Sequence, residues 1–347
     1  MTPPKSLNES GLVLGIESSC DDTAAAVVER GGRILSSVVD SQAALHAAWG
    51  GVVPEIASRS HLDSIGPVVR EALDKAGVGL DDLAGIAVTN QPGLIGSLLV
   101  GLSYAKALAF ARDLPLVGVH HIEAHVYAAT MELIEPVSSP CIALVVSGGH
   151  TALYEMQGPL KMTPIARTLD DAAGEAFDKV AYLLGLAYPG GPSVSALAKE
   201  GDPTAIRFPR YRAKDKKPGF SFSGLKTSVL YHIRGGDALA PTPAPEDIPN
   251  RADIAASFQQ AAVDNLVKPT LQACKERGAR SILVGGGVAA NRRLRECMTA
   301  EAGKRDIQVV FPSPAYCTDN AVMIAGLGWH ALKEGAWADG SLDASPR

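Results

Sequence analysis

The same order of secondary-structure signals occurs twice along this chain, and that repeat limits the fold more than any other feature of the sequence. Three short apolar runs come first, each bounded by turn residues, which predicts three strands. Helical patterns then alternate with further apolar runs, which is typical of α/β domains. In the first stretch the predicted strands lie at 12–16, 24–28, 34–39, 86–89 and 116–119, and the predicted helices at 56–73, 96–111 and from residue 121 onward.

The second stretch repeats this order. Its predicted strands lie at 142–146, 151–155, near 165, 282–284 and 308–311, and its helices at 172–184, 254–277 and from residues 291 and 318 onward. An irregular insert separates the first two of these helices, and Pro269 predicts a kink in the second. If a pseudo-two-fold axis relates the two stretches, the helix from Thr318 is the counterpart of the helix from His121, and the two face each other across a cleft.

Composition agrees with a folded protein of two domains. The 347 residues exceed the usual size of one domain, and 46% hydrophobic with 20% charged residues exclude a disordered chain. A net charge of −5 argues against a uniformly basic nucleic-acid binder, but not against a local basic patch. The five cysteines are scattered without a CxxC pair, which disfavours a disulfide framework and a zinc ribbon.

Targeting signals are not evident in the sequence. The opening residues MTPPKSLNES lack the basic and apolar segments of a secretory signal. The weakly charged stretch 94–111 contains Lys106 and several small residues, so we interpret it as a buried helix rather than a membrane span. We therefore expect a cytoplasmic protein that does not bind membranes.

His121 and His125 stand four residues apart on a predicted helix, so their imidazoles share one face. That spacing suits two ligands of one metal ion, although a solvated helix face explains such a pair about as often. Asp319, near the start of the matching helix, is a candidate third ligand, and an oxygen ligand beside two imidazoles is typical of a Lewis-acid or iron site. The stretch HHIEAH fits neither HExxH nor HxxEH, which disfavours a zincin-type protease.

Three glycine-rich turns follow or lie between predicted elements, and backbone N–H groups in such turns approach phosphates closely. With Asp178 and Asn291 available for ribose or base, the turns predict a nucleotide site; close packing of strand on helix is the alternative for the triple glycine. No GKS or GKT follows, so none is a Walker A motif. The turns are Ser147-Gly148-Gly149 after Val145 and Val146, the pair Gly190-Gly191, and 285–287.

Seven basic residues and a single acid lie between residues 207 and 226. Four aromatic residues are interleaved with them, a pattern that favours phosphate contacts and stacking on unpaired RNA bases, with a solvated loop as the alternative. The aromatic residues are Phe208, Tyr211, Phe220 and Phe222.

Nine motifs in order across nearly the whole chain together resemble the TsaD family (older name Gcp), the tRNA N6-adenosine threonylcarbamoyltransferases. They are GIESSCDDTAAAVV, HAAWGGVVPEIASRSH, GVHHIEAH, LVVSGGHT, DDAAGEAFDK, YPGGP, FSFSGLK, GGVAANRRLR and CTDNAVMIA. The resemblance implies an α/β fold of the actin-like ATPase type, with two ribonuclease-H-like domains around a central cleft. We expect the N-terminal domain at 1–135 and the C-terminal domain at 136–347, with the basic insert near 187–250.

The resemblance also implies an activity and partners. The activity is transfer of the threonylcarbamoyl group from threonylcarbamoyl-AMP to N6 of adenosine 37, in tRNAs that read codons beginning with A. The implied partners are the tRNA anticodon loop, a catalytically inactive paralogue (TsaB) and a small ATPase (TsaE).

By the same resemblance, His121, His125 and Asp319 hold one divalent metal ion per subunit, with iron(II) assigned and Zn²⁺ or Mg²⁺ as alternatives. The adenylate contacts map to Val145, Val146, Ser147, Gly148, Gly149, Asp178, Gly191 and Asn291. The chain departs from many members at three positions, where Trp49 replaces a tyrosine, Gln91 a glycine and Ser195 an aspartate.

No pattern marks a general base, and Glu17 and His46 are the two candidates. Two other classes of function stay open: an actin-fold ATPase or sugar kinase, and a metal-dependent endopeptidase. Steady ATP turnover without an acceptor would favour the first, and cleavage of a protein substrate would favour the second.

Overall fold

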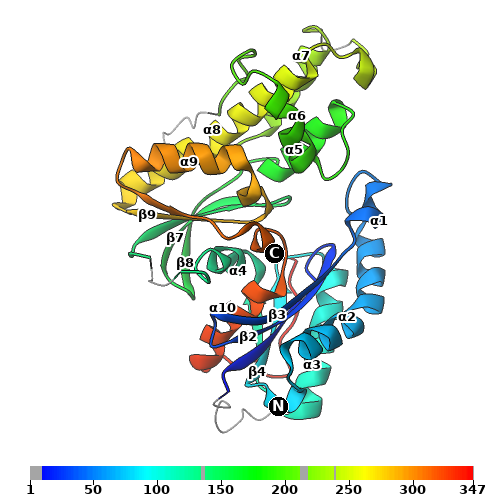
Figure 1. Ribbon diagram of the computed structural model, residues 1–347, viewed down its shortest axis with the longest axis vertical. Helices are drawn as coiled ribbons and strands as arrows, with labels where there is room; N and C mark the ends of the chain where they lie inside the picture. The colour runs from blue at the N-terminus through cyan, green and yellow to red at the C-terminus, as the bar shows by residue number, and fades with distance from the viewer. Residues whose placement is uncertain (1–9, 134–136, 212–217, 238–239, 347) are drawn as a thin grey trace. The chain divides into compact units, whose positions relative to one another are not determined.

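The computed structural model describes residues 10–133, 137–211, 218–237 and 240–346, which form two compact units (Figure 1). Unit 1 comprises Met1–Glu135, Gly158–Lys161 and Thr318–Arg347, and unit 2 comprises Pro136–Gln157 and Met162–Cys317. Each unit is built around one five-stranded mixed sheet.

The sheet of unit 1 has the strand order β3-β2-β1-β4-β5. The first three strands form an antiparallel meander, whereas β4 pairs parallel with β1 and β5 pairs parallel with β4. All five strands predicted in the first stretch are confirmed, as β1 (Leu12–Glu17), β2 (Asp22–Glu29), β3 (Arg33–Ser41), β4 (Gly85–Gln91) and β5 (Leu116–His120).

Helices cover both faces of this sheet, and the alternation of side chains along β1 shows how. Leu14 and Ile16 join the apolar core that includes residues of α2 and α3. Gly15 points to the opposite face, where a Cβ would lie 2.3 Å from the carbonyl oxygen of Ala321 in α10, so only glycine lets this helix pack so closely. The helices of unit 1 are α1 (Ala43–Ala47), α2 (Pro54–Ala76), α3 (Ile95–Arg112), α4 (His121–Ala128) and α10 (Ala321–Lys333).

Unit 2 repeats this topology, with the strand order β10-β9-β6-β7-β8 and β6 in the place of β1. β6 pairs antiparallel with β7 and parallel with β9, and β9 pairs parallel with β10. Its strands are β6 (Cys141–Val146), β7 (Thr151–Gly158), β8 (Lys161–Arg167), β9 (Ser281–Gly285) and β10 (Gln308–Val310), and its helices are α5 (Ala173–Leu183), α6 (Gly190–Leu197), α7 (Ser223–Ile233), α8 (Arg251–Arg277) and α9 (Arg292–Gly303). The twofold order of elements expected from the sequence is therefore present as two sheets of equal topology.

Several expectations need correction. The insert is not wholly irregular, because it contains α6 and α7, and α1 was not predicted. The final helix begins at Ala321 rather than at Thr318, since the Asn320 side chain accepts the Met323 N–H as its N-cap. The expected domain 136–347 is wrong in its last part: Thr318–Arg347 belongs to unit 1, because α10 packs on β1, β2, β4 and β5. The kink at Pro269 stays a prediction, inside the single helix α8.

Helix α3 is long and apolar enough to cross a membrane by length and composition, and it is the one such helix in the described ranges. Its inner face packs in unit 1 through Leu98, Leu102 and Ala105, which are buried. Its outer face carries exposed apolar residues, among them Leu99 and Phe110. The predicted buried helix is thus confirmed for one face only.

An aspartate clamp fixes the start of α7. The Asp170 carboxylate accepts hydrogen bonds from the backbone N–H groups of Phe222 and Ser223 and from the hydroxyls of Ser221 and Ser223, at 2.5–3.2 Å. Burial opposes ionisation, but these bonds outweigh it and lower the pKa of Asp170.

We predict that Asp170→Ala lowers the free energy of unfolding by about 1–2 kcal/mol at neutral pH, as loss of a helix cap does. A carboxyl with a lowered folded-state pKa stabilises above its unfolded pKa, about 3.9, and loses this effect as the pH falls through the folded value. Denaturant unfolding at pH 7 and in steps below pH 4 should therefore show the deficit shrinking with acidification. Asp63→Ala, which removes an exposed carboxylate from α2, is the control; an equal loss there would refute the clamp.

Candidate functional site

The two histidines and the aspartate that the sequence singled out lie together in unit 1. His121 and His125 stand on α4, which begins where β5 ends. Their Nε2 atoms lie 3.5 Å and 3.1 Å from Oδ1 of Asp319, which directly precedes the N-cap of α10. One donor atom of each residue lies within 4.8 Å of the other two. Asp319 thus comes from the same unit as the histidines, and not from the second domain as we expected.

A buried carboxylate fixes the orientation of His121. Glu17, the last residue of β1, has no exposed surface, and its Oε2 lies 3.0 Å from Nδ1 of His121. The same oxygen accepts a 2.6 Å hydrogen bond from the Thr89 hydroxyl, and Oε1 accepts one of 2.5 Å from the Ser19 N–H. A carboxylate that holds one imidazole nitrogen leaves the other free to bind a metal ion. This contact assigns Glu17 an orienting role rather than that of a base open to substrate.

Burial and neighbouring charges shift the pKa values of this cluster in opposite directions. Burial would lower the pKa of His121, but the carboxylates of Glu17 and Asp319 outweigh burial and raise that pKa well above its ordinary value. Burial likewise opposes ionisation of both acids, yet the charge of His121 lowers the pKa of Glu17 and of Asp319. For His125, burial and then the charge of His121 lower the pKa. The carboxylates of Glu17 and Asp319 face the imidazoles within this buried cluster, an arrangement that favours a cation.

The donor set fits a divalent metal ion. Two imidazole nitrogens and one carboxylate oxygen are the ligands of 2-His-1-carboxylate sites, which leave further positions open to substrate. Nδ1 of His125 is buried and has no hydrogen-bond partner within the described part of the chain.

The predicted phosphate turn of unit 2 follows β6. Val145 and Val146 end this strand and are fully buried, so they can offer a ligand backbone atoms only. Ser147, Gly148 and Gly149 form the turn into β7, and nothing lies within 4 Å of a Cβ built on either glycine. That open space next to exposed backbone is what a close phosphate contact requires.

The N-terminus of α5 adjoins this turn, and the N-terminus of α6 lies against the middle of α5. The Gly174 N–H, in the first turn of α5, donates to the Ser147 carbonyl at 3.2 Å. The Gly190 N–H, at the start of α6, donates to Oδ1 of Asp178 on α5 at 2.7 Å. Nothing lies within 4 Å of a Cβ built on Gly191. Asp178 therefore joins α5 to α6 through one carboxylate oxygen, and Gly191 presents open backbone beside that junction.

Asn291 is the N-cap of α9, and its amide also binds side chains of two other helices. Its Oδ1 accepts the Leu294 N–H at 3.0 Å. Its Nδ2 donates to the Ser195 hydroxyl at 3.0 Å and to Oε1 of Gln259 at 2.9 Å. Sequence reasoning missed Gln259, although a glutamine among the apolar residues of ASFQQAAV was a signal that could have marked it.

Three of the four aromatic residues of the basic insert are not available for stacking. Phe208, Phe220 and Phe222 are buried in the core of unit 2, so their interpretation as base-stacking residues is wrong. Two of the cations are paired, since Arg210 contacts Asp264 and Lys226 contacts Asp171. Residues 212–217, which hold four more of the basic residues, lie outside the described residues.

His46 is not placed as a general base. Its side chain is fully buried, Nδ1 accepts the Val53 N–H at 3.3 Å, and Nε2 lies 3.2 Å from the Gln42 amide oxygen. Gln42 in turn contacts His61, whose Nε2 donates to the Cys20 carbonyl at 3.0 Å. This network connects the segment before α2 to the turn after β1, so we assign His46 a structural role.

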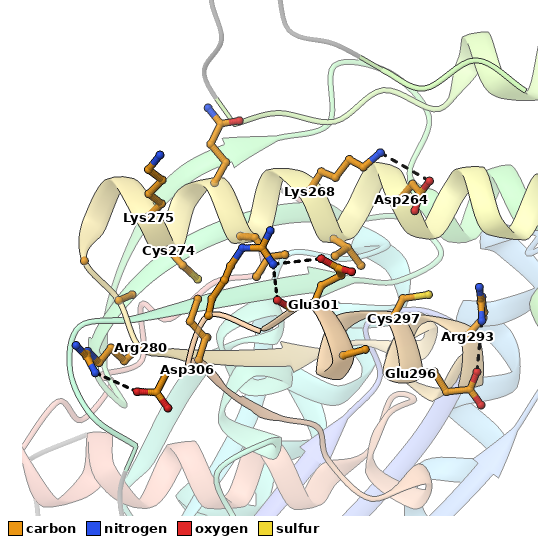
Figure 2. A pocket seen from close by; sticks show the side chains of 18 of the residues that line it. Asp264, Lys268, Cys274, Lys275, Arg280, Arg293, Glu296, Cys297, Glu301 and Asp306 are labelled. Atoms are coloured by element: carbon orange, nitrogen blue, oxygen red, sulfur yellow. Dashed lines mark hydrogen bonds and ion pairs between the residues drawn. The ribbon is translucent and has the colours of Figure 1, made fainter. Parts of the chain in front are cut away.

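A groove of 1210 Å³ lies between α8 and α9, and Figure 2 shows its charged rim. Arg280 pairs there with Asp306, and Arg293 with Glu296. None of the predicted site residues lines this groove. The volume of a groove alone therefore does not identify the functional site.

Comparison with known families agrees with the motifs. The sequence profile of the family "TsaD: tRNA N6-adenosine threonylcarbamoyltransferase" matches residues 33–326. A tRNA N6-adenosine threonylcarbamoyltransferase of Symbiobacterium thermophilum is 52% identical over 343 residues, which cover 99% of this chain and 97% of that protein. One of Geobacter metallireducens is 53% identical over 96% of this chain and 95% of its own length.

Similar solved structures bear on the fold alone, because their sequence identities are low. HypF of T. kodakarensis has a TM-score of 0.62 at 16% identity, covering 94% of this chain and 48% of that chain. Component A of the (R)-2-hydroxyglutaryl-CoA dehydratase of Acidaminococcus fermentans has a TM-score of 0.55 at 13% identity, covering 94% and 99%. The expected fold of the actin-like ATPase type, with two ribonuclease-H-like domains, is confirmed.

We predict that Glu17→Gln weakens metal binding about 10- to 100-fold, because loss of a carboxylate that orients a histidine ligand has that effect. Competition between the protein and a chromogenic chelator for Zn²⁺ or Fe²⁺ measures the change. Glu29→Gln is the matched control, since Glu29 ends β2 and pairs with Arg33 at the surface. Unchanged affinity in Glu17→Gln would contradict the orienting role.

Proposed function

The chain belongs to the TsaD family, and on that premise we propose that it transfers the threonylcarbamoyl group from threonylcarbamoyl-AMP to N6 of adenosine 37, in tRNAs that read codons beginning with A. The observation that carries the proposal is the identity of about half the residues to tRNA N6-adenosine threonylcarbamoyltransferases over nearly the full chain. The cluster of His121, His125 and Asp319 supports it, because the ligand atoms of these residues lie close enough together to hold one metal ion.

The exocyclic amine of adenine is a weak nucleophile, because its lone pair is delocalised into the ring. The acyl donor is therefore activated as a mixed anhydride, in which AMP is the leaving group: the N6–carbonyl bond forms, the carbonyl–O–phosphate bond breaks, and N6 loses a proton. The turn Ser147-Gly148-Gly149 and the helix N-terminus at Gly191 would hold the AMP phosphate through backbone N–H groups. Asp178 and Asn291 would contact the nucleoside.

We assign one divalent ion to His121, His125 and Asp319, with iron(II) preferred and Zn²⁺ or Mg²⁺ as alternatives. When bound, such an ion supplies Lewis acidity that polarises an oxygen of the threonylcarbamoyl group. Glu17 keeps the His121 imidazole oriented for this task through Nδ1. No described residue is placed as the proton acceptor, so the proton would leave to phosphate or water.

Partner proteins would bind the apolar surface of unit 1. We propose that a TsaB-type paralogue docks on α2 and α3, because these helices expose Leu62 and Leu99 at a hollow of 490 Å³. Exposed apolar patches of this kind are typical of protein interfaces. A TsaE-type ATPase and the tRNA anticodon loop complete the proposed set of partners, in the cytoplasm.

Mass spectrometry of tRNA nucleosides tests the transferase activity. Unmodified tRNA with an anticodon for codons beginning with A would be incubated with this chain, both partner proteins, ATP and threonylcarbamoyl-AMP. We expect threonylcarbamoyladenosine only when the chain is present, and none with the double variant His121→Ala/His125→Ala. Product from a metal-free double variant would refute the metal assignment. Absence of product from the parent chain with competent partners would refute the transferase activity.

We predict that Leu62→Asp weakens binding of the paralogue at least about tenfold, since a charge at the centre of an apolar interface costs 2 kcal/mol or more. Titration calorimetry with the purified paralogue measures the affinity. Tyr231→Asp places the same charge on an exposed apolar residue of α7. Equal binding by both variants would contradict docking on α2 and α3.

A further inference from the structure

Gln259, in the middle of α8, joins three elements of unit 2 that the proposed nucleotide site depends on. Its Oε1 accepts hydrogen bonds from the Ser195 hydroxyl of α6 and from Nδ2 of Asn291, the N-cap of α9, both at 2.9 Å. Asn291 Nδ2 also donates to the Ser195 hydroxyl at 3.0 Å. The three side chains thus form a closed triangle of hydrogen bonds across α6, α8 and α9.

Counting donors and acceptors shows that this triangle has one orientation. Oδ1 of Asn291 must accept the Leu294 N–H, and Nδ2 must donate to Oε1 of Gln259, so the Asn291 amide cannot be turned over without losing these bonds. Oε1 of Gln259 accepts from two donors, which settles the orientation of its own amide. Oε1 is therefore the atom through which Gln259 holds Ser195 and Asn291.

Packing does not explain a glutamine here. Gln259 is 9% exposed, and its neighbours on α8 include the buried Phe258 and Ala262. Burying an amide without hydrogen-bond partners destabilises the fold, and the bonds to Ser195 and Asn291 offset that cost at Oε1. The adjacent Gln260 differs, because it faces the α8–α9 groove and binds Arg293 and Asp264.

The chemistry of the triangle fits a ribose. Ser195 and Asn291 are uncharged and use their O–H and N–H donors within the triangle, which leaves their oxygens to accept from the vicinal hydroxyls of a ribose. The triangle contains no carboxylate, so it would meet the ribose with neutral groups. The phosphate, in contrast, suits the backbone N–H groups of Gly148, Gly149 and Gly191.

We propose that Gln259 is a positioning residue of the nucleotide site, which holds Ser195 and Asn291 in the orientation that binds the ribose hydroxyls of the adenylate. The proposal rests on the proposed function, because it takes threonylcarbamoyl-AMP as the ligand. Gln259 acts through its Oε1, so an acceptor at this position is the feature that matters.

The test measures the affinity of the full chain for AMP and for 2′,3′-dideoxy-AMP by titration calorimetry. We expect the parent to bind AMP about tenfold more tightly, as two hydrogen bonds of about 0.7 kcal/mol each would give. In Gln259→Met this preference should fall to about threefold or less, because the acceptor is lost. Gln259→Glu keeps an acceptor and should keep the preference. Gln260→Met, on the same helix, should keep it as well.

A merely structural role would change melting temperature and affinity for both nucleotides together, and would leave their ratio unchanged. Three results would overturn the proposal: an unchanged ratio in Gln259→Met, a ratio lost equally in Gln260→Met, or a ratio lost in Gln259→Glu. A parent chain that binds neither nucleotide would overturn the nucleotide site of the proposed function as well. A parent that binds AMP while Gln259→Met keeps its ratio would overturn the positioning role alone.

Discussion

Glu17 places a negative charge where water cannot reach it, and much of unit 1 is arranged around that charge. The carboxylate sits at the end of the central strand β1. Its partners come from the next two strands on one side: Thr89 from β4, and His121 directly after β5. Because these three strands are parallel, their carboxyl ends meet at one edge of the sheet. The topology thus brings Thr89 and His121 to the Glu17 carboxylate, and the contact with Glu17 orients His121.

The third ligand depends on how closely α10 approaches the sheet. Gly15 on β1 and Gly328 on α10 leave no Cβ at the contact; at Gly328 a Cβ would lie 2.3 Å from that of Ala87 on β4. With this close packing, Asp319 stands just before the helix and beside His121 and His125. A larger residue at either glycine would push the helix away and move the carboxylate from the histidines, so these glycines matter to the site although they touch no ligand.

Equal topology in the two units supports unequal chemistry. In unit 1 the carboxyl ends of the parallel strands carry ionisable side chains, whereas in unit 2 the ends of β6 and β9 carry glycines and backbone N–H groups. The first arrangement suits a cation, and the second suits a phosphate. In the described part of the chain β8 is largely exposed and was only weakly marked, but most other strands were predictable, because they are short apolar runs bounded by turn residues. The burial of the aromatic residues of the insert was not predictable, because alternating Phe and Arg or Lys is typical of a base-binding segment and of an amphipathic segment equally. Burial decided the outcome, since it stabilises Phe220 and Phe222 by about 1.5–3 kcal/mol each in every folded molecule, while stacking stabilises only a complex.

What the sequence could not disclose are contacts between residues far apart along the chain. The pattern of His121 and His125 is local, so it was visible; the bond from Gln259 to Ser195 spans 64 residues, and no periodicity marks it. The same is true of the link from His61 to Cys20 across 41 residues, which turned a suspected base, His46, into part of a buried scaffold. For both clusters the only signal in the sequence was a polar residue within an apolar stretch. Burying such a residue costs free energy unless a partner forms a hydrogen bond with it. Motifs in the sequence therefore identify the residues that we propose bind a ligand, and the structure identifies the residues that hold them in place.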